Sequence, residues 1–175
     1  MQDYANSKTK AERAAWEYQA SLKESERFEL VSINPSFILG PSICSGDGFS
    51  EEWMTSMVDG SFKRIPRAYI AFCDVRDVAL AHLNAIQVEE AANKRFIICT
   101  SDNYVRDIAN ALAPIFNPKG FKVPTVQEYG RDPSKGRDTD NRRSGEVLGL
   151  DYTPIERTVI DMVDSLLASG KIKPK

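Results

Sequence analysis

The chain opens on a stretch that can form little other than a long helix. Residues 4–26 are rich in Ala, Glu, Lys and Arg and include neither Gly nor Pro. The first group of residue types has high helix propensity, whereas Gly and Pro interrupt helices. We therefore expect one long helix, with small and apolar side chains along one side, at Ala11, Ala14, Ala15, Tyr18 and Leu22.

Tyr4 and Lys8 lie four residues apart at the start of this helix. Side chains at that spacing lie one turn apart on the same helix face. A phenol alone loses its proton only near pH 10, and a nearby ammonium favours the phenolate. A Tyr in this setting can give a proton to a carbonyl oxygen that is being reduced, or take one from an alcohol. The spacing also occurs in ordinary helices, as a half-buried aromatic beside a solvated charge.

The rest of the chain alternates between strand-like and helix-like runs. Strands are predicted at 28–33, 69–73 and 95–99. Helices are predicted at 51–59, 74–90, 102–116 and 154–167. Asn34-Pro35 would end the first strand, because proline has no amide N–H to pair. The residues after it would form a turn at the strand's carboxyl end, where open α/β sheets bind ligands.

Other reactive side chains offer no competing site. His82 is the only histidine and falls within a predicted helix, so we interpret it as structural. Cys44, Cys73 and Cys99 are far apart and lack ligand-like spacing, and the latter two fall in apolar runs typical of buried positions. Arg76 follows Asp74, and we expect it to form a salt bridge with a neighbouring acid.

Charge and hydropathy narrow the classes of partner. The net charge of −2 gives no general attraction to nucleic acid or to anionic membranes. No segment approaches the roughly 18 apolar residues that a membrane-spanning helix needs. The sequence is polar from Gln2 onward, unlike a standard signal peptide. We therefore expect a cytoplasmic protein with no nucleic-acid and no membrane partner.

Several blocks of the sequence resemble the extended short-chain dehydrogenases/reductases. The blocks are Tyr4-Ala5-Asn6-Ser7-Lys8 with Trp16-Glu17-Tyr18, and segments 31–41, 72–82, 95–99 and 148–156. Within the superfamily, which includes the NAD-dependent epimerases/dehydratases, the chain looks most like the dihydroflavonol and cinnamoyl-CoA reductases. The resemblance covers nearly the whole chain. It implies an α/β fold: the C-terminal part of an NAD(P)-binding, Rossmann-like extended reductase with its smaller substrate-binding lobe.

The resemblance also implies a reaction and its catalytic residues. The reaction would be reversible hydride transfer between NADP(H) and a carbonyl or alcohol of a small molecule. Tyr4 would be the general acid/base. Lys8 would favour its phenolate form and hold the ribose hydroxyls next to the nicotinamide. NADP is the usual cofactor of the family, and NAD stays open.

Further cofactor contacts are implied at two places. The four residues that would flank the nicotinamide are Pro35, Ser36, Phe37 and Ile38, with Ser36 near the carboxamide. Ser50 falls where the cinnamoyl-CoA-type enzymes have a cofactor-contacting Ser. It also precedes Glu51 and Glu52, which suit the first turn of a helix, and we favour a role for Ser50 as the N-cap.

The chain lacks a sequence for binding the pyrophosphate of a dinucleotide. No G-x-G-x-x-G or G-x-x-G-x-x-G occurs in it, although the family has such a turn in its first half. We interpret residues 1–175 as a single partial domain: active-site helix, late sheet strands and substrate lobe, without the nucleotide-binding half and the family's catalytic Ser or Thr.

Alternatives follow from this reading. The chain could be a catalytically inert truncated product or a domain that binds a partner, because an unpaired sheet edge would remain beside residues 28–33. A sugar-nucleotide epimerase or dehydratase would share the Tyr and Lys. The first helix could also form a homodimer, since the family uses this helix in a four-helix bundle between subunits.

Overall fold

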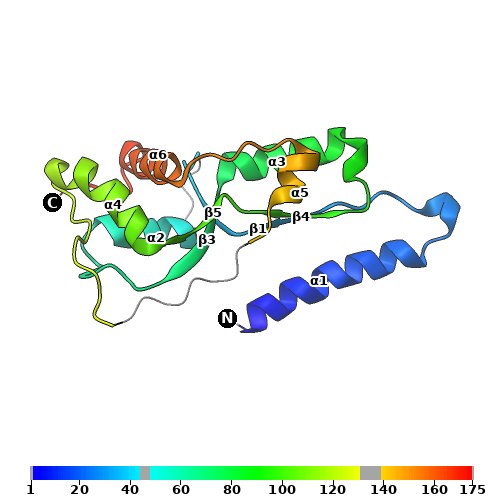
Figure 1. The fold of residues 1–175 in the computed structure, drawn as a ribbon, viewed down its shortest axis with the longest axis horizontal. Helices are drawn as coiled ribbons and strands as arrows, with labels where there is room; N and C mark the ends of the chain where they lie inside the picture. The colour runs from blue at the N-terminus through cyan, green and yellow to red at the C-terminus, as the bar shows by residue number, and fades with distance from the viewer. Residues whose placement is uncertain (1, 44–47, 131–138, 175) are drawn as a thin grey trace.

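The computed structural model describes residues 2–43, 48–130 and 139–174, with the backbone alone at 2 and 101–103 (Figure 1). The α-helices are α1 (Gln2–Ser21), α2 (Phe49–Val58), α3 (Val75–Gln87), α4 (Val105–Phe116), α5 (Arg142–Leu148) and α6 (Ile155–Ala168). The strands are β1 (Ser32–Pro35), β2 (Phe37–Leu39), β3 (Tyr69–Asp74), β4 (Arg95–Ile98) and β5 (Ser101–Tyr104). Short 3-10 turns lie at Glu24–Glu26, Glu89–Ala91 and Asn117–Lys119.

The strands form two small sheets, and the predicted α/β class is confirmed. In the first sheet, β1 and β4 pair in parallel from Ser32 opposite Arg95 to Pro35 opposite Ile98. In the second, β2 pairs in parallel with β3, and β5 pairs antiparallel with the other edge of β3. The order β2-β3-β5 thus adds an antiparallel edge strand to the expected parallel pairing.

The first strand ends at Pro35, close to the predicted end, but it begins at Ser32 rather than near residue 28 and pairs with β4 through Asn34 and Pro35. The Ser32 N–H donates to Lys94 O (3.0 Å) and the Ser36 N–H donates to Ile98 O (2.9 Å). Successive backbone groups of a strand point to opposite edges, so position 35 faces away from β4 and loses no bond to it. Ser36 alone therefore links β1 to β2, and residues 35–38 do not form a separate turn.

Three helix boundaries also differ from the prediction. The first helix ends at Ser21, before residue 26. Residues 101–104 form β5 instead of the start of a helix, because they pair with β3, and α4 begins at Val105. The N-cap of α2 is Gly48, and Ser50 lies inside the first turn, so the expected N-cap role of Ser50 is wrong.

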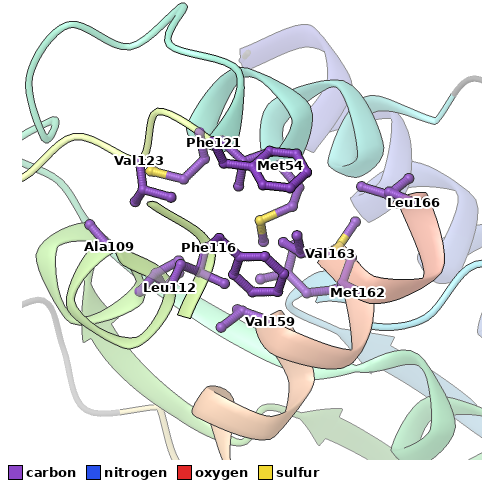
Figure 2. Close-up of a cluster of buried hydrophobic side chains, with 14 of the residues drawn as sticks. Met54, Ala109, Leu112, Phe116, Phe121, Val123, Val159, Met162, Val163 and Leu166 are labelled. Atoms are coloured by element: carbon purple, nitrogen blue, oxygen red, sulfur yellow. The ribbon is translucent and has the colours of Figure 1, made fainter. Parts of the chain in front are cut away.

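The larger hydrophobic core lies between α2, α4, α6 and the second sheet. Figure 2 shows Met54, Phe116 and Val163 turned toward one another from three different helices. All three side chains are fully buried. This cluster forms the lobe that the resemblance assigns to the substrate side.

A smaller core joins α3 and α5 to the first sheet. Its buried members include Val78 and Ala81 of α3, Phe96 of β4 and Leu148 of α5. Figure 1 shows α1 on the opposite side of β1 and β4, running antiparallel to β1, so that the N-terminal end of α1 and the carboxyl end of β1 lie toward the same end of the molecule. Among the helices of the described residues, none is long and apolar enough to cross a membrane.

Candidate functional site

Tyr4 and Lys8 lie together on α1, as their spacing predicts. Lys8 Nζ lies 5.4 Å from the centroid of the Tyr4 ring, over its face. The Tyr4 side chain is 70% exposed. The Ser7 hydroxyl donates to the Tyr4 carbonyl (2.7 Å) and so caps a backbone acceptor without occupying the phenol. The phenol and the ammonium therefore form one accessible polar group near the start of the helix.

The position of α1 is set by polar contacts farther along the helix. The Arg95 guanidinium of β4 donates to both carboxylate oxygens of Glu12 (2.9 and 3.1 Å). Trp16 Nε1 donates to the same carboxylate (3.3 Å). The hydrogen bond from Arg95, aided by that from Trp16, lowers the pKa of Glu12 to about 2 against a smaller opposing effect of burial.

The C-terminal end of α1 has a second attachment. Gln19 is the buried polar side chain of this helix, and its Nε2 donates to Phe28 O and to Asn93 Oδ1, both at 2.8 Å. Asn93 Oδ1 also accepts from the Leu30 N–H (3.3 Å). The contacts of α1 with the sheet thus lie at Glu12 and beyond, while the end with Tyr4 and Lys8 extends along the molecule as an exposed arm.

Two hydroxyls lie at the carboxyl ends of β1 and β4. Ser36 directly follows β1, and Thr100 lies two residues past the end of β4. Ser36 Oγ and Thr100 Oγ1 are buried, and the described part of the chain supplies neither with a hydrogen-bond partner. A buried hydroxyl without a partner is costly, so a ligand with both donors and acceptors would be stabilised here. The sequence prediction included Ser36 and missed Thr100, whose only signal is its place after a buried strand.

The neighbour of Ser36 is a thiol. Burial raises the pKa of Cys73 to about 11, with the Ser36 hydroxyl beside it acting in the opposite direction. A thiol is a weak hydrogen-bonding group, and one this basic stays protonated near neutral pH. Cys73 therefore fills space next to Ser36 and leaves the hydroxyl available to a stronger partner. Cys73 and Cys99 are both buried, as predicted, and Cys44 lies outside the described residues.

Aromatic side chains gather around Phe37, the first residue of β2. The ring centroid of Phe37 lies 5.7 Å from that of Trp53 and 6.0 Å from that of Phe49, both in edge-to-face geometry. Phe37 also packs against Phe72 of β3 at 5.9 Å. Phe49 is 75% exposed, so one side of this group is open to a ligand.

Ile38 and Ser50 line a common cavity of about 230 Å³. Its other walls come from the chain after β2 and from Val75 and Met162. The structure therefore brings these two predicted residues together, next to the aromatic group around Phe37. It does not place Pro35 in that cavity, and Pro35 is instead exposed at the edge of β1.

The carboxyl end of β3 is held by the buried carboxylate of Asp74, which pairs with the partly exposed guanidinium of Arg76. Asp74 accepts from the Arg76 backbone N–H (2.7 Å), from the Arg76 guanidinium (2.9 and 2.7 Å) and from Thr158 Oγ1 (2.7 Å). Burial raises the pKa of Asp74, but these hydrogen bonds outweigh it, so the net shift is downward. The predicted salt bridge of Arg76 is confirmed and extends to Asp161 (2.6 Å). His82 Nδ1 lies 2.8 Å from Val78 O on its own helix, which fits a structural role.

Known proteins resemble this chain over most of its length, although no protein-family model matches it. The NADPH-dependent methylglyoxal reductase Gre2 of Saccharomyces cerevisiae is 31% identical over 173 residues, which are 94% of this chain and 50% of the relative. Cinnamoyl-CoA reductase 1 of Arabidopsis thaliana is 30% identical over 171 residues, 98% of this chain and 48% of the relative. The chain spans about half the length of the curated relatives it matches.

Solved structures give the same correspondence. Yeast Gre2 complexed with NADPH has a TM-score of 0.81 and 31% identity, covering 97% of this chain and 52% of that chain. Vestitone reductase from alfalfa, at 20% identity and a TM-score of 0.77, shares the fold. The family and fold expected from the sequence blocks are thus confirmed: the chain corresponds to the C-terminal half of an extended short-chain dehydrogenase/reductase of the branch that includes Gre2 and the cinnamoyl-CoA reductases.

Proposed function

We propose that this chain supplies the proton-transfer and substrate-facing side of an NADP(H)-dependent reductase that interconverts a carbonyl and an alcohol. The observation that carries the proposal is the placement of Lys8 Nζ over the Tyr4 ring at an exposed helix end. That end lies toward the carboxyl ends of β1 and β4, where open α/β sheets bind ligands (Figure 1). Similarity to the NADPH-dependent Gre2 supports the cofactor.

The residues at the strand ends suit a nicotinamide. A carboxamide has two N–H donors and a carbonyl acceptor, and the buried hydroxyls of Ser36 and Thr100 can each donate and accept. Lys8 would bind the ribose hydroxyls, and the segment from Pro35 to Ile38 would flank the ring. When bound, NADPH supplies the hydride. The pyrophosphate-binding turn of the family's proteins has no counterpart in these 175 residues. We therefore propose the activity for the completed enzyme, meaning this chain together with a nucleotide-binding half.

The proton follows a short path. As the carbonyl carbon of the substrate receives the hydride, its oxygen gains negative charge and takes the proton of the Tyr4 hydroxyl. The phenolate that remains is stabilised by the Lys8 ammonium. In the direction of oxidation, the same phenolate removes the proton from the alcohol. Tyr4 would thus be the general acid/base, and Lys8 would favour the phenolate form of Tyr4 over the phenol.

The aromatic group at the start of β2 favours apolar substrates. Phe37, Phe49 and Trp53 form a wall that is open on the side of Phe49. Aromatic rings bind flat, apolar groups by burial and edge-to-face contact. We propose that a small aldehyde or ketone with an apolar substituent lies against this wall, with its oxygen toward Tyr4.

The small side chains of α1 support a homodimer as part of this proposal. Ala11, Ala14, Ala15 and Tyr18 are all exposed on the helix. A stripe of this kind lets two helices approach closely. Dimerisation through it would leave Tyr4 and Lys8 on the helix end rather than in the interface.

The substitution Tyr4→Phe in the completed enzyme tests the proposed role. We expect carbonyl reduction to fall by at least about 100-fold, the scale of general acid/base catalysis, while NADPH affinity measured by calorimetry stays nearly unchanged. Tyr18→Phe on the same helix is the matched control and should retain turnover. Full turnover by Tyr4→Phe would exclude Tyr4 as the acid/base.

The second candidate function is that of a catalytically inert chain that binds a partner. It is favoured by α1, most of whose side chains are exposed. Calorimetry of the 175-residue chain with NADPH separates the two. Binding in the micromolar range would support a chain that works alone, whereas no heat of binding would show that the completing half is required.

A further inference from the structure

The peptide group between Cys99 and Thr100 joins the two sheets and is held on both sides. It follows the end of β4, and its N–H donates to the carbonyl of Phe72 in β3 (2.7 Å). Its carbonyl, that of Cys99, accepts from Nδ2 of Asn141 (2.6 Å). The N–H and the C=O of one planar peptide group point in opposite directions, so these two hydrogen bonds fix its plane. The backbone from which the Thr100 side chain projects is therefore fixed by contacts on both sides.

Asn141 lies at the N-cap position of α5, yet its side chain does not cap that helix. A capping side chain would accept a hydrogen bond from an N–H of the first turn. The Asn141 amide instead donates to the carbonyl of Cys99, 42 residues away along the chain. The backbone of Asn141 is anchored in turn, because its carbonyl accepts from the N–H (3.1 Å) and the hydroxyl (2.5 Å) of the buried Ser144. Asn141 thus holds the end of β4 rather than the start of α5.

The side chain that follows this peptide group is the hydroxyl of Thr100. Thr100 Oγ1 is buried, and no group of the described residues forms a hydrogen bond with it. Pro35 lies opposite Ile98 in the register of β1 and β4, so Ser36 and Thr100 both lie just past the same end of the first sheet. A buried hydroxyl without a partner costs stability, which points to a ligand as its partner.

We propose that Asn141 is a positioning residue, which directs the hydroxyl of Thr100 toward the carboxamide of a bound nicotinamide. The inference rests on the proposed function and adds Asn141 to the residues that serve it. Thr100 would contact the cofactor itself. Asn141 would act through the backbone, because it holds the carbonyl of Cys99 and with it the peptide group that precedes the Thr100 side chain.

Amide hydrogen exchange in the 175-residue chain tests the positioning by itself. Asn141→Asp keeps the size of the side chain and suits a helix N-cap, but an ionised carboxylate has no N–H to donate. We expect exchange at the Thr100 amide to become at least about tenfold faster, while the Ser36 amide, which bonds to Ile98 O, keeps its rate. Asn110→Asp, at an exposed residue of α4, is the matched control and should change neither rate. If Asn141→Asp does not fold, Asn141→Ala removes the donor without adding a charge and should give the same result.

A double-substitution cycle in the completed enzyme tests the purpose of the positioning. Thr100→Val removes the hydroxyl and keeps the shape, so NADPH binding measured by calorimetry should weaken by about tenfold, and Asn141→Asp should weaken it similarly. Because both changes act through one hydroxyl, the double variant should bind about as weakly as either single variant. The stability of Thr100→Val in urea should not fall, since the lost hydroxyl has no partner in the described residues. Thr125→Val, at an exposed residue away from the strand ends, should bind NADPH like the unchanged enzyme.

Three results would overturn the role of Asn141. They are an unchanged exchange rate at Thr100 in Asn141→Asp, an unchanged NADPH affinity of that variant, and a double variant whose two losses multiply to about 100-fold, as for independent sites. If the variants weaken NADPH binding as expected but the unchanged completed enzyme reduces no carbonyl, the proposed function is refuted and the role of Asn141 stands. A completed enzyme that does not bind NADPH would refute both.

Discussion

The lobe formed by α2, α4 and α6 has a fully buried apolar core, whereas α1 leaves Tyr4 and Tyr18 largely exposed. Met54, Phe116 and Val163 have no exposed surface in the lobe (Figure 2). In contrast, Tyr4 is 70% and Tyr18 is 62% exposed on α1. Burial of apolar surface contributes most of the stability of a fold, so the two regions should differ greatly in local stability.

The lobe and α1 also differ in how they are held in place. The lobe has a core of its own, against which Phe37 and Trp53 pack. α1 is held to the sheet by two polar attachments, at Glu12 and Gln19, whereas most of the stability of a helix in a protein comes from packing of an apolar face. Tyr4, the proposed acid/base residue, is thus on the region with fewer packing contacts.

The largest effect is expected in the core of the lobe. Phe116→Ala removes a fully buried ring that packs edge-to-face on Phe121. We expect the free energy of unfolding, measured with urea, to fall by about 3–5 kcal/mol. Ile115→Ala on the same helix, at a 37% exposed residue, should cost clearly less. Equal losses for the two variants would mean that the buried ring of Phe116 contributes no more than a partly exposed side chain of the same helix.

A smaller loss is expected at the end of β3. Asp74→Asn removes the charge that accepts from Arg76 and Thr158, and hydrogen bonds to charged groups contribute about 1.5–3 kcal/mol. The loss should appear in the same urea titration. Asp164→Asn, at an exposed residue of α6, is the control and should change little. A neutral Asp74→Asn would show that the ion pair adds nothing to the packing of the lobe.

The pattern of the sequence predicted the regular elements well and their junctions poorly. The long helix, the strand after residue 95 and the last helix are all present, since each has a clear periodic or β-prone run. Residues 101–104 could not be recognised as a strand, because their pairing with β3 is a tertiary contact. That β1 pairs through Pro35 could not be predicted for a similar reason: the effect of the proline depends on which edge of the strand its nitrogen faces.

The sequence predicted the candidate site only where its residues lie close together along the chain. Tyr4 and Lys8 share a face because the helix repeat places them there, and the sequence holds that repeat. The cavity that Ile38 shares with Ser50 and the placement of Ser36 and Thr100 at neighbouring strand ends depend on tertiary packing. Glu12 and Arg95 are 83 residues apart along the chain, and no sequence pattern indicates that they pair.

At the attachment of α1, Gln19→Ala should produce a local effect. It removes two hydrogen bonds from a buried side chain and leaves Asn93 Oδ1 with one donor fewer, at a cost of about 1–2 kcal/mol. We expect faster amide exchange along α1 and an unchanged rate at Leu112 in the lobe. Lys10→Ala, at an exposed residue of α1, should alter neither. Global unfolding of Gln19→Ala would instead make α1 an integral part of the core.

The smallest effect is expected at Glu12, and it should depend on pH. The pKa of Glu12 is about 2, below its ordinary value of 4.5, so its pairing with Arg95 stabilises the docked helix above pH 4.5 and is lost as the pH falls toward 2. Arg95 is half exposed, so the contribution is only about 0.2–1 kcal/mol. The Trp16 indole N–H, which donates to Glu12, reports this change in NMR spectra.

Glu12→Gln should remove most of the change of the Trp16 signal between pH 4.5 and pH 2, and Glu17→Gln on the same helix should retain it. A Trp16 signal that moves with a midpoint near pH 4.5 would mean that Arg95 does not hold Glu12, and that α1 is free of the sheet at this point. A midpoint near 2 would place the attachment where the structure has it. The arm that carries Tyr4 and Lys8 would then begin at Glu12, where the polar contacts of α1 with the sheet begin.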